Sequence, residues 1–210
     1  MDQSFWMARW RQGQTGWHLP HPNPLLVKYW DALALPPGAQ VFVPLCGKSE
    51  DMVWLAQQGY RVLGNELCQQ AVAAFFAERG LEPTREALNH QQIRWQAGPY
   101  TLIEGDFFRL TPTLTAQVSA VYDRAALVAL PPPQRAQYAR ALRQLVPAGS
   151  GYLLISLEGP VAEQVGPPFS VPEREIRRLF AALPSLRHRA VHPHVRKGEN
   201  WEEHVWLGRF

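Results

Sequence analysis

The sequence predicts an α/β fold in which a mostly parallel sheet carries helices on both faces. Two observations lead to this prediction. Short apolar runs, long enough for buried strands, alternate along the 210-residue chain with longer segments that have helical periodicity. In addition, the stretch from Val41 to Glu66 has the pattern of strand, tight turn, helix, second strand and terminal carboxylate, which is the front half of a nucleotide-binding unit.

The stretch from Val41 to Glu66 predicts a nucleoside ligand. It begins with VFVPL, an apolar run typical of a strand buried on both faces, and the following CGKS supplies a glycine for a tight turn. Ser49 is a good N-cap for the helix, and Gly59 ends that helix. Glu66 follows about 20 residues beyond the turn, where a carboxylate accepts hydrogen bonds from ribose hydroxyls in dinucleotide folds.

Three classes of ligand compete for this unit. Gly47, Lys48 and Ser49 match the end of a phosphate-binding P-loop, but Phe42 stands where that motif requires its first glycine. A nicotinamide cofactor needs a G-x-G-x-x-G turn, whereas Gly47 stands between bulky residues. S-adenosylmethionine has no phosphate, so it tolerates a turn with fewer glycines while still using the ribose carboxylate. It fits best, and a P-loop-like nucleotide hydrolase and a non-catalytic sensor that binds S-adenosylmethionine stay as alternatives.

Two further strands end in polar residues. YTLIEGDFFRL predicts a strand that ends near Asp106 and Phe107, and VSAVYDRAALVAL predicts one that ends at Asp123 and Arg124. Asp106 either accepts from the adenine amino group or caps a turn, and Phe107 either stacks on the base or belongs to the core. Because ligands bind outside the carboxyl ends of strands in open α/β sheets, this edge is the expected site.

The later elements follow from periodicity. PPPQRAQYARALRQLV and VPEREIRRLFAAL predict amphipathic helices, and GYLLISL predicts a strand between them. SLRHRAV and EEHVWLGRF predict two last strands that form a hairpin, because a Lys/Gly/Glu/Asn turn separates them. The long segment from Leu81 to Pro99 is an insertion to which the pattern assigns no fold.

Several separated motifs together resemble those of the thiopurine S-methyltransferase family, especially its bacterial branch associated with tellurite and selenium methylation. The motifs are FWMARWRQGQTGWH, NPLL, VPLCGKSEDMVWLAQQGYRVLGNE, GDFF, VYDRAALVALPPPQRAQYA and GPPFSV, in this order, between Phe5 and Phe180. The resemblance implies a seven-stranded, Rossmann-like sheet of the class I S-adenosylmethionine-dependent methyltransferase type, with its last strand antiparallel. It also implies S-adenosylmethionine as cofactor and S-adenosylhomocysteine as product.

The same resemblance implies a set of cofactor-binding residues: Trp10, Leu45, Glu66 and Arg124 in contact with the cofactor, and Asp106 and Phe107 near the adenine. Arg124 either binds the methionine carboxylate or holds a polar loop closed. No residue is assigned as a catalytic base, since an acidic thiol needs none. The implied reaction is direct methyl transfer to a thiopurine or aryl thiol, or to a selenium or tellurium species. The segment after the fifth strand departs from the family pattern at Glu158, which leaves the acceptor open.

Composition agrees with one methyltransferase domain spanning residues 1–210. The chain is 46% hydrophobic, and its 21 basic residues are scattered with a net charge of only +3, so no nucleic-acid partner is expected. No apolar run is long enough for a signal peptide or a membrane span. Cys46 and Cys68 form neither a disulfide framework nor a zinc motif, which is consistent with a reducing, cytoplasmic setting. A monomer is the expectation from the family.

Two side-chain groups stand apart from these motifs. Residues 1–36 form an aromatic-rich arm, with Phe5, Trp6, Trp10, Trp17 and Trp30, that is either an amphipathic helix packed on the sheet or a lid over the pocket. Four histidines gather late in the chain, at positions 188, 192, 194 and 204. Pro193 favours an extended surface segment there, and no cysteine or acidic partner recurs at zinc spacing, so no metal site is expected.

Overall fold

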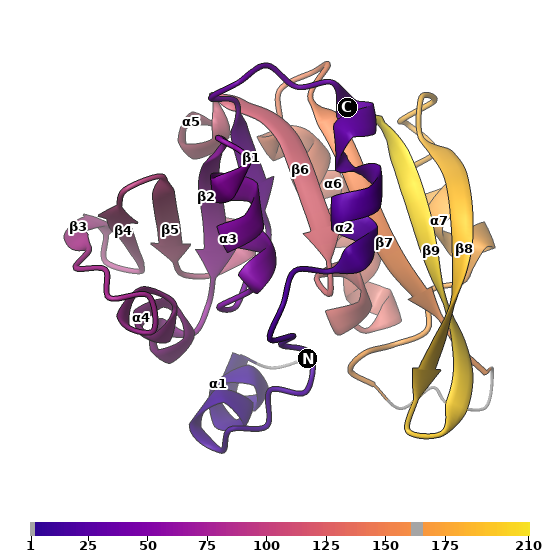
Figure 1. The fold of residues 1–210 in the computed structure, drawn as a ribbon, viewed down its shortest axis with the longest axis horizontal. Coiled ribbons are helices and arrows are strands. Elements are labelled where there is room, and N and C mark those ends of the chain that lie inside the picture. The colour runs from indigo at the N-terminus through magenta and orange to yellow at the C-terminus, as the bar shows by residue number, and fades with distance from the viewer. Residues whose placement is uncertain (1–2, 161–165) are drawn as a thin grey trace.

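The protein, represented by a computed structural model, contains one sheet with helices on both of its faces (Figure 1). The structure describes residues 3–160 and 166–210. The strands in that part of the chain are β1 (Gln40–Val43), β2 (Arg61–Glu66), β3 (Thr84–Asn89), β4 (Gln92–Ala97), β5 (Tyr100–Glu104), β6 (Val118–Arg124), β7 (Gly151–Glu158), β8 (Arg187–Arg196) and β9 (Glu199–Arg209). The α-helices are α1 (Gln3–Arg11), α2 (Pro24–Tyr29), α3 (Glu50–Gln57), α4 (Gln69–Ala77), α5 (Pro112–Thr115), α6 (Pro132–Leu145) and α7 (Glu173–Leu179). Short 3-10 helices are η1 (Trp30–Leu33), η2 (Phe107–Arg109) and η3 (Leu127–Ala129).

The strand order confirms the predicted fold class. The sheet runs β3-β4-β5-β2-β1-β6-β7-β9-β8, and the pairs β1–β2, β1–β6, β2–β5 and β6–β7 are parallel. The last strand, β9, is antiparallel to both of its neighbours, β7 and β8. The order reverses between β1 and β6, so the carboxyl ends of these strands border the crevice where ligands bind in such sheets.

The predicted number of strands is wrong, because the described sheet has nine strands and not seven. The two additional strands, β3 and β4, form an antiparallel hairpin that continues the sheet beyond β5. Both lie in the segment from Leu81 to Pro99, which the sequence pattern left unassigned. β3 is exposed along most of its length and so lacks the apolar alternation of a half-buried strand.

Two apolar cores lie on opposite faces of the sheet. One contains residues of α6 and α7, and the other contains residues of α2, α3 and α4. Successive side chains of β1 alternate between them: Phe42 belongs to the first core, whereas Val41 and Val43 belong to the second. This two-sided burial explains the uninterrupted apolar run in that strand.

The turn after β1 and the N-terminal arm follow their sequence signals. The side chain of Ser49 caps α3 by accepting from the amide of Asp51, and Gly59 follows the helix with a φ of +86°. The side chain of Asn23 caps α2, and its backbone amide donates to the carboxylate of Asp51 at 2.6 Å. Asp51 is buried and also accepts a hydrogen bond from Tyr122, which fastens the arm to the sheet.

The sheet ends at β8, whose side chains alternate between half-buried and exposed positions. The predicted closing hairpin is confirmed by its pairing with β9, and Pro193 lies within β8 opposite Glu202. In the described ranges, no helix has the length and apolar character needed to cross a membrane.

Candidate functional site

A pocket lies at the carboxyl edge of the sheet, where β1, β2 and β6 end. It is lined by residues from the first turn (Leu45, Cys46, Gly47, Lys48 and Ser49), from the ends of β2 and β6 (Glu66, Leu67, Tyr122, Arg124 and Ala125) and from the N-terminal arm (Gln3, Trp6, Trp10, Trp17 and His18). The other lining residues are Val43, Asp51, Asp106, Phe107, Phe108, Val128, Ala129, Leu130, Gln134, Tyr138, Pro167 and Pro168. The six residues that the sequence analysis singled out for cofactor binding all line this one pocket.

Glu66 is the buried carboxylate of the pocket. Its Oε2 accepts a hydrogen bond from the amide of Gly47 at 2.9 Å, and its Oε1 accepts one from the amide of Cys68 at 2.8 Å. Burial raises the pKa of Glu66, while these backbone hydrogen bonds oppose that rise. Each carboxylate oxygen keeps a second acceptor site, so the group can still accept from two hydroxyls of a diol.

Two non-glycine residues at this edge have left-handed backbone conformations. Leu45 follows β1 with a φ of +48°, and Ala125 follows β6 with a φ of +62°. Such conformations cost about 1–3 kcal/mol each and persist where the surrounding structure imposes them, often at ligand sites. Both residues line the pocket, so the chain turns sharply at the ends of two neighbouring strands and brings its backbone to the cavity.

Trp10 closes one side of the turn after β1. It is buried, packs with Cys68 and Ala71 of the α4 region, and meets Trp17 edge to face at 5.8 Å between ring centroids. A Cβ atom at Gly47 would lie 3.2 Å from the Trp10 ring. Gly47 also has a φ of +55°, so this position needs glycine for both conformation and space.

Asp106 and Phe107 are already engaged within the protein. Asp106 caps η2 by accepting from the amide of Phe108 at 2.9 Å, and it accepts from the side chain of Gln3 at 3.2 Å. Phe107 is buried and packs against Phe42 and Tyr138. Both residues therefore have the structural roles that the sequence analysis considered as alternatives, although both also line the pocket.

Arg124 links the end of β6 to the N-terminal arm. Its Nη1 donates a hydrogen bond to the backbone carbonyl of Trp17 at 3.0 Å. This contact corresponds to the second of the two roles considered for it, holding a polar loop closed. The arm segment after α1 is thus fastened to the sheet by a side chain that lines the pocket.

A buried polar cluster lies beneath the pocket wall. Asp123 is fully buried, and one of its oxygens accepts from Tyr138 at 2.7 Å and from Tyr152 at 3.0 Å. Its other oxygen accepts from the amide of Leu127 at 3.3 Å. Burial raises the pKa of Asp123 to about 6 against the opposing effect of these hydrogen bonds. The cluster fixes Tyr138, which belongs to the pocket lining.

Two residues of the turn after β1 do not fit other chemistries. Lys48 forms an ion pair with Glu78 of the α4 end, and this charge pairing differs from the free lysine that a P-loop needs. Cys46 is buried, and burial raises the pKa of its thiol, which disfavours the thiolate that a nucleophile requires. His18, also in the lining, has a pKa lowered by partial burial.

Sequence reasoning did not single out several residues of the pocket lining. They are Tyr122, Gln134, Tyr138, Pro167 and Pro168. The sequence did contain a signal for two of them, because Gln134 and Tyr138 are four residues apart in α6 and so share one helix face. Tyr122 lies inside an apolar strand, and nothing in its neighbourhood separates it from a core residue.

The chain is similar to proteins of one family. The family model described as thiopurine S-methyltransferase matches residues 1–206. The chain is 49% identical over 180 residues to a thiopurine S-methyltransferase of Methylococcus capsulatus, covering 86% of this chain and 81% of that protein. It is 43% identical over 213 residues to one of Aliivibrio fischeri, covering 99% of both.

Solved structures share the fold at low sequence identity. A 1,6-didemethyltoxoflavin-N1-methyltransferase of Burkholderia thailandensis, with bound 1,6-didemethyltoxoflavin and S-adenosylhomocysteine, has a TM-score of 0.70 at 16% identity, and the match covers 99% of this chain and 86% of that chain. The magnesium protoporphyrin IX methyltransferase of Synechocystis, with bound S-adenosylhomocysteine, has a TM-score of 0.67 at 14% identity, covering 99% and 100%. The family match spans nearly the whole sequence, and the fold agrees with it. This chain belongs to the thiopurine S-methyltransferase family and is an S-adenosylmethionine-dependent methyltransferase.

Proposed function

We propose that this enzyme methylates the sulfur of thiopurines or aryl thiols, and that selenium and tellurium species, and with them tellurite resistance, are further candidates. The observation that carries the proposal is the lining of the pocket, in which a buried carboxylate and exposed backbone share one cavity with aromatic and aliphatic walls. Family membership does not favour the alternatives of a P-loop-like hydrolase or a non-catalytic sensor.

The residues at the β1 and β2 ends fit the cofactor. When bound, S-adenosylmethionine supplies an electrophilic methyl group on a positively charged sulfur. Glu66 retains acceptor sites for a ribose diol, and the left-handed turn at Leu45 brings backbone groups to the cavity. Trp10 offers an aromatic ring, which attracts a cation. We therefore assign cofactor binding to Trp10, Leu45, Glu66, Asp106, Phe107 and Arg124 as a proposal.

A second group of lining residues fits a flat, apolar acceptor. Phe108, Leu130, Pro167 and Pro168 contribute apolar surface, and Gln134 contributes a neutral amide. Aromatic rings pack favourably on such walls, and the walls keep water from the reacting sulfur. The nearby arginine, Arg124, favours an acceptor that carries negative charge, such as a thiolate.

The titratable groups of the lining favour an acceptor that ionises without help. Among the described lining residues, the one histidine is His18, and the carboxylates of Asp51, Glu66 and Asp106 all accept hydrogen bonds from other groups of the protein. No residue is therefore assigned as a base. An aryl thiol ionises near neutral pH, unlike the corresponding phenol, so positioning and exclusion of water suffice.

A matched panel of acceptors tests this proposal. The purified enzyme and S-adenosylmethionine are incubated with an aryl thiol, the corresponding phenol, a thiopurine, selenite and tellurite, and methylated products are identified by mass spectrometry. We expect the thiol and the thiopurine to be methylated and the phenol to be unreactive. Equal turnover of thiol and phenol would contradict the proposal, because a phenol needs a base to remove its proton and the proposal assigns none.

We also propose that residues 1–36 act as a lid of the single domain 1–210. Trp6, Trp10 and Trp17 form a chain of edge-to-face contacts that lines the pocket, and Arg124 fastens the segment at Trp17. Tryptophan fluorescence should change on addition of S-adenosylhomocysteine, and Trp17→Phe should remove most of that change. An unaltered signal in Trp17→Phe would argue against the lid, because Trp17 contacts both Trp6 and Trp10 and a movement of the arm would change its surroundings.

We also propose that the protein is cytoplasmic and that it is a monomer. Both cysteines are buried and free, which suits the reducing environment of the cytoplasm, and a monomer is the expectation from the family. Sedimentation at several protein concentrations would test the second of these, since a stable dimer would keep twice the expected mass on dilution.

A further inference from the structure

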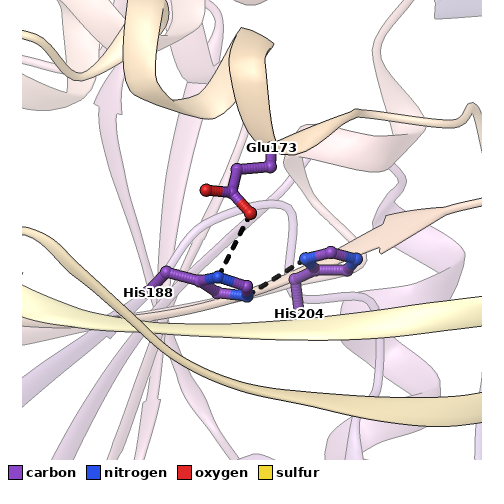
Figure 2. Close-up of side chains that lie close together, drawn as sticks. All are labelled: Glu173, His188 and His204. Atoms are coloured by element: carbon purple, nitrogen blue, oxygen red, sulfur yellow. Dashed lines mark hydrogen bonds and ion pairs between the residues drawn. The ribbon is translucent and has the colours of Figure 1, made fainter.

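A cluster of metal-binding side chains lies outside the pocket lining. It consists of Glu173, the first residue of α7, His188 of β8 and His204 of β9 (Figure 2). The sequence analysis expected no metal site among the late histidines, because no acidic residue stood near them at a recognised spacing. The fold supplies that residue from a helix 15 positions upstream of His188.

The three side chains are close enough to hold one ion. Glu173 Oε2 lies 3.2 Å from His188 Nδ1, and His188 Nε2 lies 3.1 Å from His204 Nδ1. One donor atom from each residue can be chosen so that all three lie within 4.8 Å of one another. Ligand atoms around a four-coordinate zinc ion, with bonds of about 2.0–2.2 Å, are roughly 3.3 Å apart. The two short contacts involve opposite nitrogens of His188, so one ion uses only one of them, and the side chains draw together from the 4.8 Å spacing when they bind it.

His204 provides an independent observation that points to a ligand. It is 5% exposed, and its Nε2 has no hydrogen-bond partner. That nitrogen lies 3.4 Å from a carboxylate oxygen of Glu202 and 3.6 Å from one of Glu158. If the proton of neutral His204 were on Nδ1, the lone pair of Nε2 would face two carboxylates, which is unfavourable. A metal ion bound at Nδ1 instead keeps the proton on Nε2, where it points toward these carboxylates.

The arrangement matches the way proteins usually support metal-binding histidines. Such histidines donate their second ring nitrogen to a carboxylate, which fixes the tautomer and strengthens the ligand. Glu202 and Glu158 are placed for this function beside His204. The excess of carboxylates over nearby cations also favours a doubly charged ion, although Glu173 pairs with Arg177.

We propose that Glu173, His188 and His204 bind a divalent transition-metal ion of the zinc class, with water completing the coordination. Each imidazole binds the ion through one nitrogen and keeps its proton on the other, so the ring protons in the line from Glu173 through His188 to His204 rearrange onto the nitrogens that face away from the ion. Two imidazoles and one carboxylate are the donors that zinc prefers over magnesium or calcium. This inference does not rest on the proposed acceptor.

The position of the site suggests what the ion does. Glu173 begins α7, five residues after Pro168 of the pocket wall, and the two histidines belong to the terminal hairpin. A bound ion ties the start of α7 to β8 and β9. It therefore restrains the chain that leads out of the pocket wall, and its role is to stabilise that wall.

Metal titration of the full chain tests the site. Protein freed of any affinity tag and treated with chelator is titrated with Zn²⁺ by calorimetry and with Co²⁺ by visible absorption. We expect one equivalent of Zn²⁺ to bind and the Co²⁺ complex to show the ligand-field bands of a site with imidazole ligands. His188→Ala and Glu173→Gln should weaken binding by roughly 100-fold and at least tenfold. Thermal stability of the unaltered chain should rise with Zn²⁺.

The control is His194→Ala, which removes a more exposed histidine of the same strand, β8. It should bind Zn²⁺ as the unaltered chain does. Absence of stoichiometric binding, or equal binding by the unaltered chain and His188→Ala, would overturn the proposal. The three side chains would then only interact with one another. His188 and Glu173 are only half-buried, so their variants carry the test even where His204→Ala does not fold.

Discussion

The carboxylate of Glu66 accepts a hydrogen bond from the backbone amide of Gly47, with 2.9 Å between Oε2 and the amide nitrogen. Its other oxygen accepts from the amide of Cys68. One side chain therefore joins the turn after β1 to the turn after β2, and both turns border the pocket. The residue proposed to bind the ribose also sets the shape of the cavity that receives it.

Glu66→Gln should weaken binding of S-adenosylhomocysteine by roughly 10- to 100-fold, measured by calorimetry. Glutamine has the same size, but its amide group must point a donor at the amide of Gly47 or Cys68. Glu104→Gln is the matched control, because Glu104 is the register partner of Glu66 on β5 and lies outside the pocket lining. Unchanged affinity in Glu66→Gln would refute the assignment of this carboxylate.

The two tyrosines that bind Asp123 make a second matched pair. Tyr138→Phe and Tyr152→Phe each remove one hydrogen bond to the same oxygen, so each should lower the free energy of unfolding by about 1–3 kcal/mol. Only Tyr138 lines the pocket. We expect only Tyr138→Phe to change KM for the acceptor, as measured by steady-state kinetics. Equal effects of the two substitutions on KM would show that Tyr138 influences the acceptor only by stabilising the buried cluster, and not by contact with the acceptor.

Asp123 should make stability depend on pH in a specific direction. Its pKa is about 6 in the folded protein against 3.8 ordinarily, because burial disfavours the charged form. The protonated form therefore stabilises the fold fully below pH 4, and this contribution is lost as pH rises through 6. Asp123→Asn lacks this titration. The free energy of unfolding of the unaltered chain, minus that of Asp123→Asn, should fall by up to about 3 kcal/mol between pH 4 and 7.

Urea unfolding at a series of pH values measures this difference. A difference that stays constant over that range would mean that the carboxylate titrates at its ordinary pKa. Because both proteins share all other titrating groups, their common pH dependence cancels in the subtraction.

Ala125→Gly should stabilise the fold by about 1 kcal/mol, because Ala125 has a φ of +62° that glycine adopts without strain. The control is Ala129→Gly, whose φ is not in the left-handed region and which should lower stability by about 0.5–1 kcal/mol. Chemical unfolding gives both values. If Ala125→Gly also destabilises, then the side-chain contact of Ala125 with the core outweighs the backbone strain.

The sequence predicted the parts of this molecule that depend on local chemistry. The unit from β1 to β2 was predictable because its key residues interact with the backbone nearby. Ser49 caps α3, Gly59 adopts the positive φ that follows the helix, and Glu66 accepts from the amide of Gly47. The β8–β9 hairpin was predictable because its turn residues separate two alternating runs. The β3–β4 hairpin was not, because β3 lies at an exposed edge and buries too little to show a pattern.

The site was predictable in part for the same reason. Residues at strand ends, such as Leu45 and Arg124, can be located once the strands are known. The joining of Arg124 to Trp17, and of Glu173 to His188, depends on how segments far apart in the chain pack together. No spacing in the sequence encodes those contacts, so only the folded chain reveals them.

The edge of the sheet at β8 has a consequence for solubility. An outermost strand exposes hydrogen-bonding groups along its free side, and a second chain can pair with them and start an aggregate. Pro193 has no N–H to offer near the middle of that strand, so the row of donors is interrupted. The proline that indicated an extended surface segment in the sequence therefore opposes intermolecular strand addition at this edge.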